Sequence, residues 1–172
     1  MTHRAAPSSP MLMDACVLID FIKADRSVLE LIVKYVGSLC VISPVVAEVN
    51  EINDEGELIE LGLTIVEPEI EDAYTAASQT GPISFQDRLC LLTAKRLGFT
   101  CVTNDKNLRK LCEKENVPLS WGLQLLADLH RLGGIPTDDA LDIARRIHKA
   151  NPRHITSQII KGFTAAIEKQ QR

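Results

Sequence analysis

Short apolar runs alternate along the chain with segments in which apolar residues recur every three or four positions. The first pattern is typical of buried strands and the second of amphipathic helices, so their alternation predicts a parallel sheet built from β-α-β units. We expect strands at 11–13, 39–42, 63–67, 100–103 and 117–120. We expect helices at 16–35, from 43 toward 53, after 67 through 74, and at 84–97, 106–115, 121–132, 137–150 and 155–170. The pattern therefore predicts an α/β fold that ends in helices.

Turn-forming residues separate these segments and mark the predicted boundaries. Ser43 and Pro44 supply an N-cap and a first-turn proline for one helix, and the glycine pair at 133–134 ends another. The chain has 172 residues, which is the length of one domain. We therefore expect a loose N-terminal arm at 1–10, an α/β domain at 11–126 and a helical extension at 127–172 packed on the same domain.

Composition narrows the class of protein. Hydrophobic residues make up 45% of the chain and charged residues 24%, which is a globular mixture. The longest uncharged stretch is too short to cross a membrane, because Gly37 and Pro44 interrupt it. The first ten residues lack the apolar core of a secretion signal. These features predict a cytoplasmic protein with no membrane span.

The charge of the chain is unevenly distributed around a net value of −4. Residues 145–172 carry seven Lys or Arg residues and a single acidic residue, Glu168. A run of this kind is usually a solvated helix face. On an acidic protein it could also contact RNA phosphates or an acidic partner.

Several common catalytic motifs are missing from the sequence. The five cysteines form no C-x-x-C pair, and the four histidines form no H-E-x-x-H motif. There is no G-x-S-x-G motif and no P-loop. The cysteines lie in apolar stretches, where they are expected to be buried thiols. A zinc site, a disulfide framework, a serine hydrolase and a P-loop enzyme are all disfavoured.

Four acidic residues are expected at one edge of the predicted sheet. Asp14 and Asp105 follow the first and fourth strands. Glu48 lies in the helix after the second strand, and Asp87 lies in the first turn of the helix at 84–97. Strand C-termini and helix N-termini share one edge of such a sheet, and ligands bind there where the strand order reverses. Four separate segments therefore each bring one carboxylate to this edge.

Each carboxylate also has a local structural explanation. Ser84 and Asp87 resemble a capping box, Asp105 suits a helix start, and Glu48 could be an exposed helix residue. Asp14 is harder to explain because it interrupts an apolar run. Together, like charges would repel by roughly 4 kcal/mol per pair at 4 Å unless a cation neutralised them. Such oxygen ligands suit Mg²⁺ or Mn²⁺, which assist the hydrolysis of phosphate esters.

The same segments resemble the PIN-domain ribonucleases, in order from Leu12 to about Leu126. The motifs are Leu12-Met-Asp14-Ala-Cys-Val-Leu-Ile19, Ile42-Ser-Pro-Val-Val-Ala-Glu48-Val, Asp87 with Ala94-Lys-Arg-Leu-Gly98, and Val102-Thr-Asn-Asp105. The resemblance implies a three-layer α/β/α sandwich with a central parallel sheet. It also implies a Mg²⁺- or Mn²⁺-dependent endoribonuclease with RNA as its substrate.

The resemblance assigns catalytic roles to the four acidic residues. Asp14, Asp87 and Asp105 would be the core metal ligands. Glu48 would complete the cluster, either as a ligand or by positioning water.

Two further residues are expected to support the site. Thr103 matches a hydroxyl residue that supports the site in the family. Cys16 stands where the family often has Ser or Asn, and a thiol is a much weaker hydrogen-bonding group. Support for Asp14 is therefore expected from elsewhere, with Ser43 as the candidate.

The resemblance also implies partners. Many stand-alone members are VapC-type toxins of toxin–antitoxin pairs, which implies an antitoxin partner and a homodimer. The extension after Leu126 departs from the compact toxins and looks closer to PIN subfamilies with C-terminal helices. The alternative function is a PIN-fold module that binds protein or RNA without catalysis. A phosphotransfer protein would also place Asp at strand ends, but it needs a second acid after the first strand, where Cys16 stands.

Overall fold

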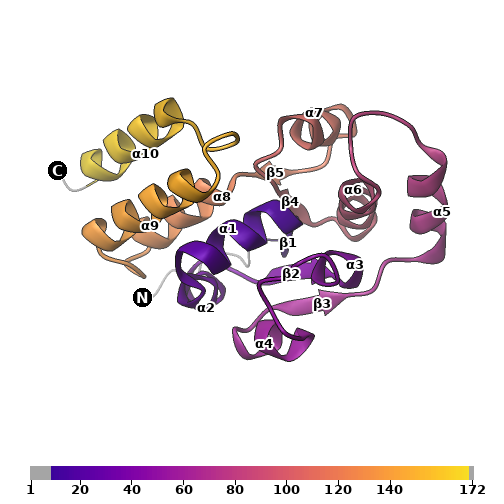
Figure 1. Ribbon diagram of the computed structural model, residues 1–172, viewed down its shortest axis with the longest axis horizontal. Coiled ribbons are helices and arrows are strands. Elements are labelled where there is room, and N and C mark those ends of the chain that lie inside the picture. The colour runs from indigo at the N-terminus through magenta and orange to yellow at the C-terminus, as the bar shows by residue number, and fades with distance from the viewer. Residues whose placement is uncertain (1–8, 171–172) are drawn as a thin grey trace, which may run out of the picture.

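The fold is a three-layer α/β/α sandwich around one sheet of five parallel strands (Figure 1). The computed structural model describes residues 9–170, so nearly all of the predicted arm at 1–10 lies outside the described residues. The strand order is β3-β2-β1-β4-β5, and every neighbouring pair is parallel. The strands are β1 (Met11–Met13), β2 (Leu39–Ile42), β3 (Thr64–Val66), β4 (Thr100–Val102) and β5 (Leu119–Ser120).

Helices connect the strands and continue beyond the last one. Those before β4 are α1 (Ala15–Asp25), α2 (Ser27–Tyr35), α3 (Ser43–Val46), α4 (Glu55–Glu60), α5 (Ile70–Ser78) and α6 (Phe85–Leu97). Those after β4 are α7 (Lys106–Lys114), α8 (Gly122–Arg131), α9 (Thr137–Ala150) and α10 (Ser157–Lys169). The predicted α/β fold with C-terminal helices is confirmed.

The strand order places the helices on both faces of the sheet. From β1 the chain moves to β2 and β3 on one side, and it then returns to β4 and β5 on the other. Because such crossovers are right-handed, α1 and α2 cover one face, and α6 and α7 cover the opposite face. The long helix α6 packs against β1 and β4, and α8 returns to pack on α2.

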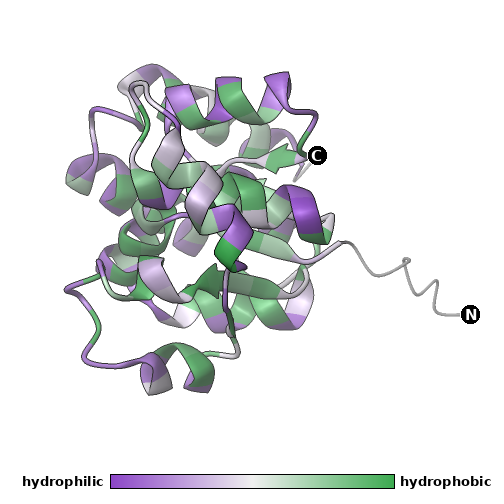
Figure 2. Ribbon diagram, turned by 90° about the vertical axis from the view of Figure 1, so that its right-hand side faces the viewer, coloured by the Kyte–Doolittle hydropathy of each residue, from purple (hydrophilic) through white to green (hydrophobic). Residues whose placement is uncertain are grey.

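The core lies between the sheet and these helices. Every residue of β1 and β2 is buried, as expected for central parallel strands covered on both faces. The largest fully buried side chain is Phe21, on α1. Figure 2 shows hydrophobic residues concentrated in the strands and on the helix faces turned toward them.

Two predicted helices are shorter in the structure than their sequence pattern suggested. The helix predicted at 16–35 is divided at Arg26, because the Asp25 carboxylate accepts hydrogen bonds from the backbone N–H and hydroxyl of Ser27. The helix predicted from 43 toward 53 ends at Val46, and turns follow it. An unpredicted helix, α4, begins where Asp54 accepts a hydrogen bond from a backbone N–H of its first turn.

The C-terminal helices pack on the side of the sheet that α1 and α2 cover. Helix α9 lies along α1, and the Arg146 guanidinium donates a hydrogen bond to the Ala24 carbonyl oxygen at 3.2 Å. The turn between α8 and α9 approaches α2 closely at Gly134. A Cβ atom added there would lie 2.4 Å from a Leu129 methyl and 2.9 Å from the ring of Tyr35. No described helix is long and apolar enough to span a bilayer.

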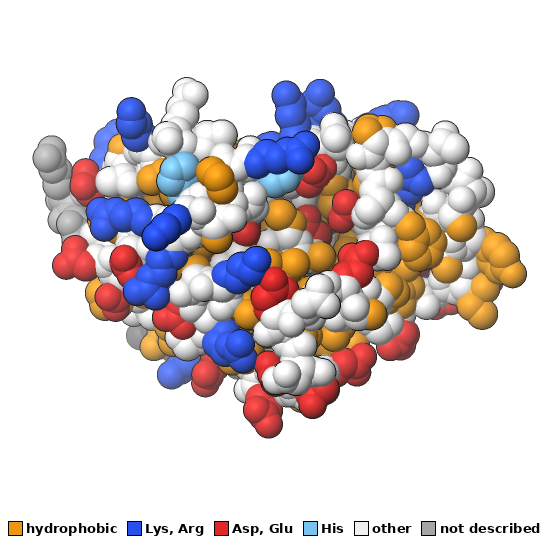
Figure 3. Space-filling model, viewed as in Figure 1, with side chains coloured by type: hydrophobic (Ala, Val, Ile, Leu, Met, Phe, Trp, Pro, Cys, Tyr) orange, Lys and Arg blue, Asp and Glu red, His pale blue; other side chains and the backbone are white. Residues whose placement is uncertain are grey.

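Charged side chains are segregated on the molecular surface. In Figure 3, Lys and Arg side chains lie mainly over the upper and left parts of the visible face, where α7, α9 and α10 lie in Figure 1. Asp and Glu side chains gather along its lower edge, near α4. This distribution agrees with the basic character of residues 145–172.

Candidate functional site

The candidate site lies between the C-terminal ends of β1 and β4. These strands are neighbours, and the chain leaves them toward opposite sides of the sheet. The Asp14 backbone N–H donates to the Val102 carbonyl oxygen at 3.0 Å, which joins the two strand ends directly. This is the switch point at which ligands bind in open α/β sheets.

Asp14 is the most constrained residue of the site. It is the N-cap of α1, only 1% of its surface is exposed, and one carboxylate oxygen accepts a hydrogen bond from the Val17 backbone N–H at 2.8 Å. The other oxygen accepts a hydrogen bond from the Thr103 hydroxyl. Both oxygens are therefore held in fixed directions at the end of β1.

Thr103 and Asp105 form the adjoining part of the site. The Thr103 hydroxyl oxygen also accepts a hydrogen bond from the Asp105 backbone N–H at 3.0 Å. Asp105 is the N-cap of α7 and accepts hydrogen bonds from two backbone N–H groups of the first turn, each at 2.8 Å. The hydroxyl thus lies between the segments that carry Asp14 and Asp105 and is hydrogen-bonded to both.

Asp87 and Glu48 approach the same region from two other segments. Asp87 lies in the first turn of α6, where its backbone N–H donates to the Ser84 hydroxyl oxygen at 3.0 Å. Glu48 lies in the turn after α3, not inside a helix as the sequence suggested, and it is exposed.

The electrostatics of the site show that its carboxylates influence one another. The pKa of Asp14 is raised to about 7, mainly by burial. The hydrogen bonds from Thr103 and Val17 lower this pKa, and the negative charge of Asp87 contributes to raising it. The pKa of Asp87 is raised by burial and by the charge of Asp105. The pKa of Glu48 is likewise raised by burial and by Asp87. Asp87 therefore connects the cluster electrostatically.

The donor chemistry of these residues fits a hard divalent cation. Within residues 9–170, none of the four carboxylates forms an ion pair with a Lys, Arg or His side chain. Carboxylate oxygens are the ligands that Mg²⁺ and Mn²⁺ prefer. However, no three Asp, Glu, His or Cys side chains among the described residues form a group able to hold a metal ion as they stand. The charges and donors fit the cation, whereas the side chains are not assembled around a common point.

Ser43 does not support Asp14 in the way the sequence suggested. Its hydroxyl donates to the Glu67 carboxylate at 2.7 Å. Ser43 begins α3 at the end of β2, whose other neighbour, β3, ends just before Glu67. The serine is thus oriented toward β3 instead of β1, and Thr103 and Val17 supply the hydrogen bonds to Asp14.

A buried polar network beside the site was not predicted from the sequence. Asp20, which is only 5% exposed, accepts a hydrogen bond from the Asn104 side-chain amide at 3.1 Å. It also accepts hydrogen bonds from the Asn151 side-chain amide at 3.1 and 3.0 Å. The same amide of Asn151 lies 3.4 Å from the Cys16 sulfur. An isolated acid in the apolar helix of residues 15–25 was the one sequence signal for this network.

Asn104 and Cys16 are structural members of this region. The Asn104 side-chain oxygen accepts a hydrogen bond from the Gly122 backbone N–H at 3.1 Å, which ties the start of α8 to the end of β4. Burial raises the pKa of Cys16 to about 12, so this residue is a neutral thiol. Neither residue supplies a charge to the site.

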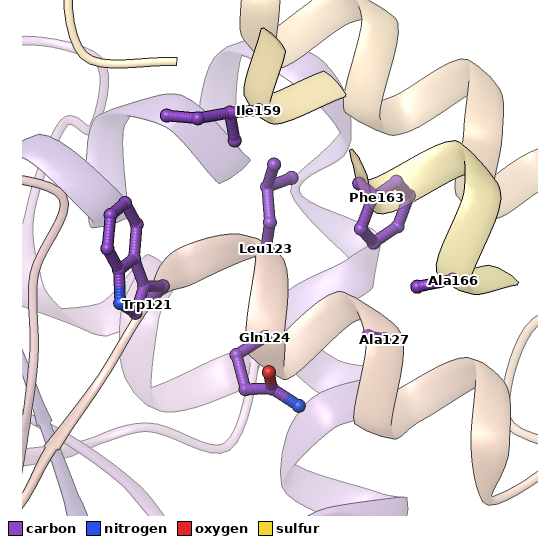
Figure 4. Close-up of a pocket in the computed structure, with 7 residues that line it drawn as sticks. All are labelled: Trp121, Leu123, Gln124, Ala127, Ile159, Phe163 and Ala166. Atoms are coloured by element: carbon purple, nitrogen blue, oxygen red, sulfur yellow. The ribbon is translucent and has the colours of Figure 1, made fainter. Parts of the chain in front are cut away.

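An apolar groove lies between α8 and α10, next to the C-terminal end of β5 (Figure 4). Its volume is about 320 Å³, and side chains including Trp121, Ile159 and Phe163 line it. The Arg109 guanidinium stacks on the Trp121 ring at 3.5 Å from the ring centre. Trp121 is therefore partly exposed and covered by a cation on one face.

Comparisons with known proteins identify one family. The family model described as PIN domain matches residues 11–114, which cover β1 to α7 and all four carboxylates. No curated protein matches the chain closely enough to count as a relative.

Proposed function

The chain belongs to the PIN-domain family, whose members are generally nucleases, and we propose that it is a metal-dependent endoribonuclease. One observation carries the proposal. Four carboxylates from four segments lie close enough to influence one another's ionisation, and none of them forms an ion pair with a cation of the described residues. Such a concentration of negative charge is costly unless a bound cation offsets it.

The family resemblance assigns a role to each residue of the cluster. Asp14, Asp87 and Asp105 would hold Mg²⁺ or Mn²⁺, and Glu48 would either join them or position the attacking water. A bound ion lowers the pKa of water and stabilises the negative charge that develops on the phosphate oxygens. Thr103 fixes the carboxylate of Asp14 through its hydroxyl, as the Val17 N–H does from the other side.

The reaction is the hydrolysis of a phosphodiester bond. The water oxygen forms a bond to phosphorus, the bond from phosphorus to the 3′ oxygen breaks, and the 3′ oxygen takes up a proton from solvent, which leaves a 5′-phosphate and a 3′-hydroxyl. Glu48 is the exposed carboxylate beside Asp87, and it is therefore the group available to accept the proton of the water.

Cation binding must bring the side chains closer together than they lie in the structure. Asp14 and Asp105 are held by backbone hydrogen bonds. The larger movement is therefore expected from Asp87 and Glu48.

A cleavage assay with labelled single-stranded RNA tests the proposal. We expect cleavage by the wild-type protein with Mn²⁺ and a loss of roughly 100-fold or more in rate for Asp87→Asn, because charge stabilisation at the phosphate depends on this cluster. Asp139→Asn is the matched control, since Asp139 is an exposed carboxylate in the first turn of α9. Equal cleavage by wild type and Asp87→Asn, or no cleavage by folded wild type on any RNA, would contradict the proposal.

A module that binds RNA or protein without cleaving it is the second candidate function. It is favoured by the absence of an assembled ligand group among the described residues and by the basic C-terminal helices. A protein of this kind has no need of a metal ion. Mn²⁺ binding by the wild-type protein therefore separates the two candidates.

The toxin role is proposed on the family resemblance alone, and the antitoxin partner and the homodimer stay predictions of that resemblance. Expression of a toxin of this kind should arrest bacterial growth, and Asp87→Asn should relieve the arrest. Unimpaired growth with soluble wild-type protein would contradict the toxin role and leave the nuclease proposal standing.

A further inference from the structure

Among the described residues, the Lys and Arg side chains before α7 differ in ion pairing from those that follow. Most of those before α7 form ion pairs, as Lys23 does with Glu51 and Lys95 with Glu115. From α7 onward, many exposed cations have no ion pair with a described residue. They are Lys106, Lys110, Lys114, Arg145, Lys149, Arg153, Lys161 and Lys169.

The loop at residues 151–156, between α9 and α10, is anchored next to the carboxylate site. Asn151 opens the loop, and its side-chain amide donates to both oxygens of Asp20 on α1. The Ile155 side chain is fully buried, and its backbone N–H donates to the Asn151 carbonyl oxygen at 3.0 Å. Contacts at both ends thus hold the loop in one conformation against the protein.

The anchor lies at the start of α1, close to Asp14. The Asn151 amide also contacts Cys16, only two residues after Asp14. Burial raises the pKa of Asp20, and His154, near the other end of the loop, lies close enough to that carboxyl to oppose part of the rise. Arg153 is exposed between these two contacts, and Lys149 is exposed in the last turn of α9 just before them.

We propose that this loop and the last turn of α9 bind the phosphate backbone of the RNA strand beside the cleavage site, through Lys149 and Arg153. The inference rests on the proposed function and extends it by naming the surface that positions the substrate. Lys149 and Arg153 each neutralise a phosphate next to the one that is cleaved.

An RNA strand can bind beside these carboxylates only if cationic side chains nearby attract its phosphates. The carboxylates repel every phosphate of an RNA strand that is not bound to a metal ion. Arg88 follows Asp87 in the sequence, but it is buried and its guanidinium donates to the carbonyl oxygens of Gln79 and Gly81. Lys149 and Arg153 are exposed and form no ion pair with a described residue, so they can bind phosphate on the α1 side of the site.

RNA affinity and its salt dependence test the inference. The probe is a fluorescein-labelled, unstructured 20-nucleotide RNA, with binding measured by anisotropy in EDTA so that no metal-dependent cleavage occurs. We expect Lys149→Ala/Arg153→Ala to weaken binding about tenfold at low salt and to reduce the slope of log K against log salt by about 1.4, since each phosphate contact on a single strand contributes about 0.7.

A double variant of equal charge change serves as the control. Lys34 lies in the last turn of α2 and Lys169 is the last residue of α10, and both are exposed and outside the loop. Lys34→Ala/Lys169→Ala should retain wild-type affinity and salt slope. In the Mn²⁺-dependent cleavage assay, the loop variant should raise KM about tenfold while kcat at saturating RNA stays within about twofold of wild type.

Failure of this inference can be distinguished from failure of the proposed function. If the loop variant binds and cleaves RNA as the control does, the inference is wrong and the nuclease stands. If wild type binds RNA through the loop but does not cleave it with Mn²⁺, the loop is an RNA-binding surface and the nuclease proposal is wrong. If folded wild type does not bind the RNA, the inference is wrong.

Discussion

Replacing Asp14 by Asn should stabilise the metal-free protein at neutral and alkaline pH. Asp14 is buried, and burial raises its pKa from an ordinary value of 3.8 to about 7. At a pH between these two pKa values, the Asp14 carboxyl has lost its proton in the unfolded chain but keeps it in the folded protein. Wild-type stability therefore falls as the pH rises from about 4 to about 7, and above that range the whole cost of a buried charge is present.

The structure sets the size of the effect. A tenfold change in an ionisation constant corresponds to about 1.4 kcal/mol, so the raised pKa of Asp14 corresponds to roughly 4 kcal/mol above pH 7. Asparagine is an equally good N-cap and can still accept the hydrogen bond from Val17. Its amide must replace the oxygen that accepts from the Thr103 hydroxyl, which costs about 1 kcal/mol. A net gain of about 3 kcal/mol is expected.

Urea unfolding of both proteins in EDTA, from pH 4 to pH 8, measures this effect. The free-energy difference between Asp14→Asn and wild type should be near zero or slightly unfavourable at pH 4 and should rise toward about 3 kcal/mol by pH 8. Asp54→Asn is the control, because Asp54 is an exposed N-cap of α4 and its charge is solvated. A difference that stays flat across this pH range, or a variant less stable than wild type at pH 8, would refute the reasoning.

Three further substitutions test neighbouring parts of the structure. Asn151→Ala removes the amide that hydrogen-bonds to buried Asp20 and should lower the free energy of unfolding by about 1–3 kcal/mol in urea titrations; an unchanged midpoint would contradict the anchoring of the loop. Thr103→Val removes the hydroxyl that donates to Asp14 and should weaken Mn²⁺ binding about tenfold by calorimetry; unchanged affinity would remove Thr103 from the site. Gly134→Ala places a methyl group where none fits and should cost about 1–3 kcal/mol in thermal unfolding; a neutral result would show that the turn between α8 and α9 adjusts.

The sheet and the positions of two acids could be predicted because the signals for them are local. Asp14 directly follows the short apolar run at 11–13, and Asp105 comes three residues after the run at 100–102. Each of these acids is the N-cap of the helix that begins there. One carboxylate therefore marks both the end of a strand and the start of a helix. Since parallel strands end at a common edge, the position of both acids at that edge could be expected from the sequence.

Other features depend on contacts that no local pattern encodes. Asn151 lies 131 positions from Asp20, so nothing near either residue indicates their hydrogen bonds. The apolar periodicity of 16–35 runs through Arg26 without a break, and only the short-range bonds of the Asp25 carboxylate show where α1 ends. Glu48 was expected in a helix, but turns follow α3 directly. Polar contacts that divide or join helices were therefore the least predictable part of the molecule.

Isothermal titration of Mn²⁺ into the metal-free protein tests the central claim most directly, because it asks whether acids from separate segments act as one cation site. Wild type should bind the ion saturably with release of protons, as carboxyls with raised pKa values lose them on binding. Asp105→Asn and Asp87→Asn should each abolish or greatly weaken this binding, whereas Asp54→Asn should leave it unchanged. Absence of saturable binding by folded wild type, or equal binding by all four proteins, would contradict the claim.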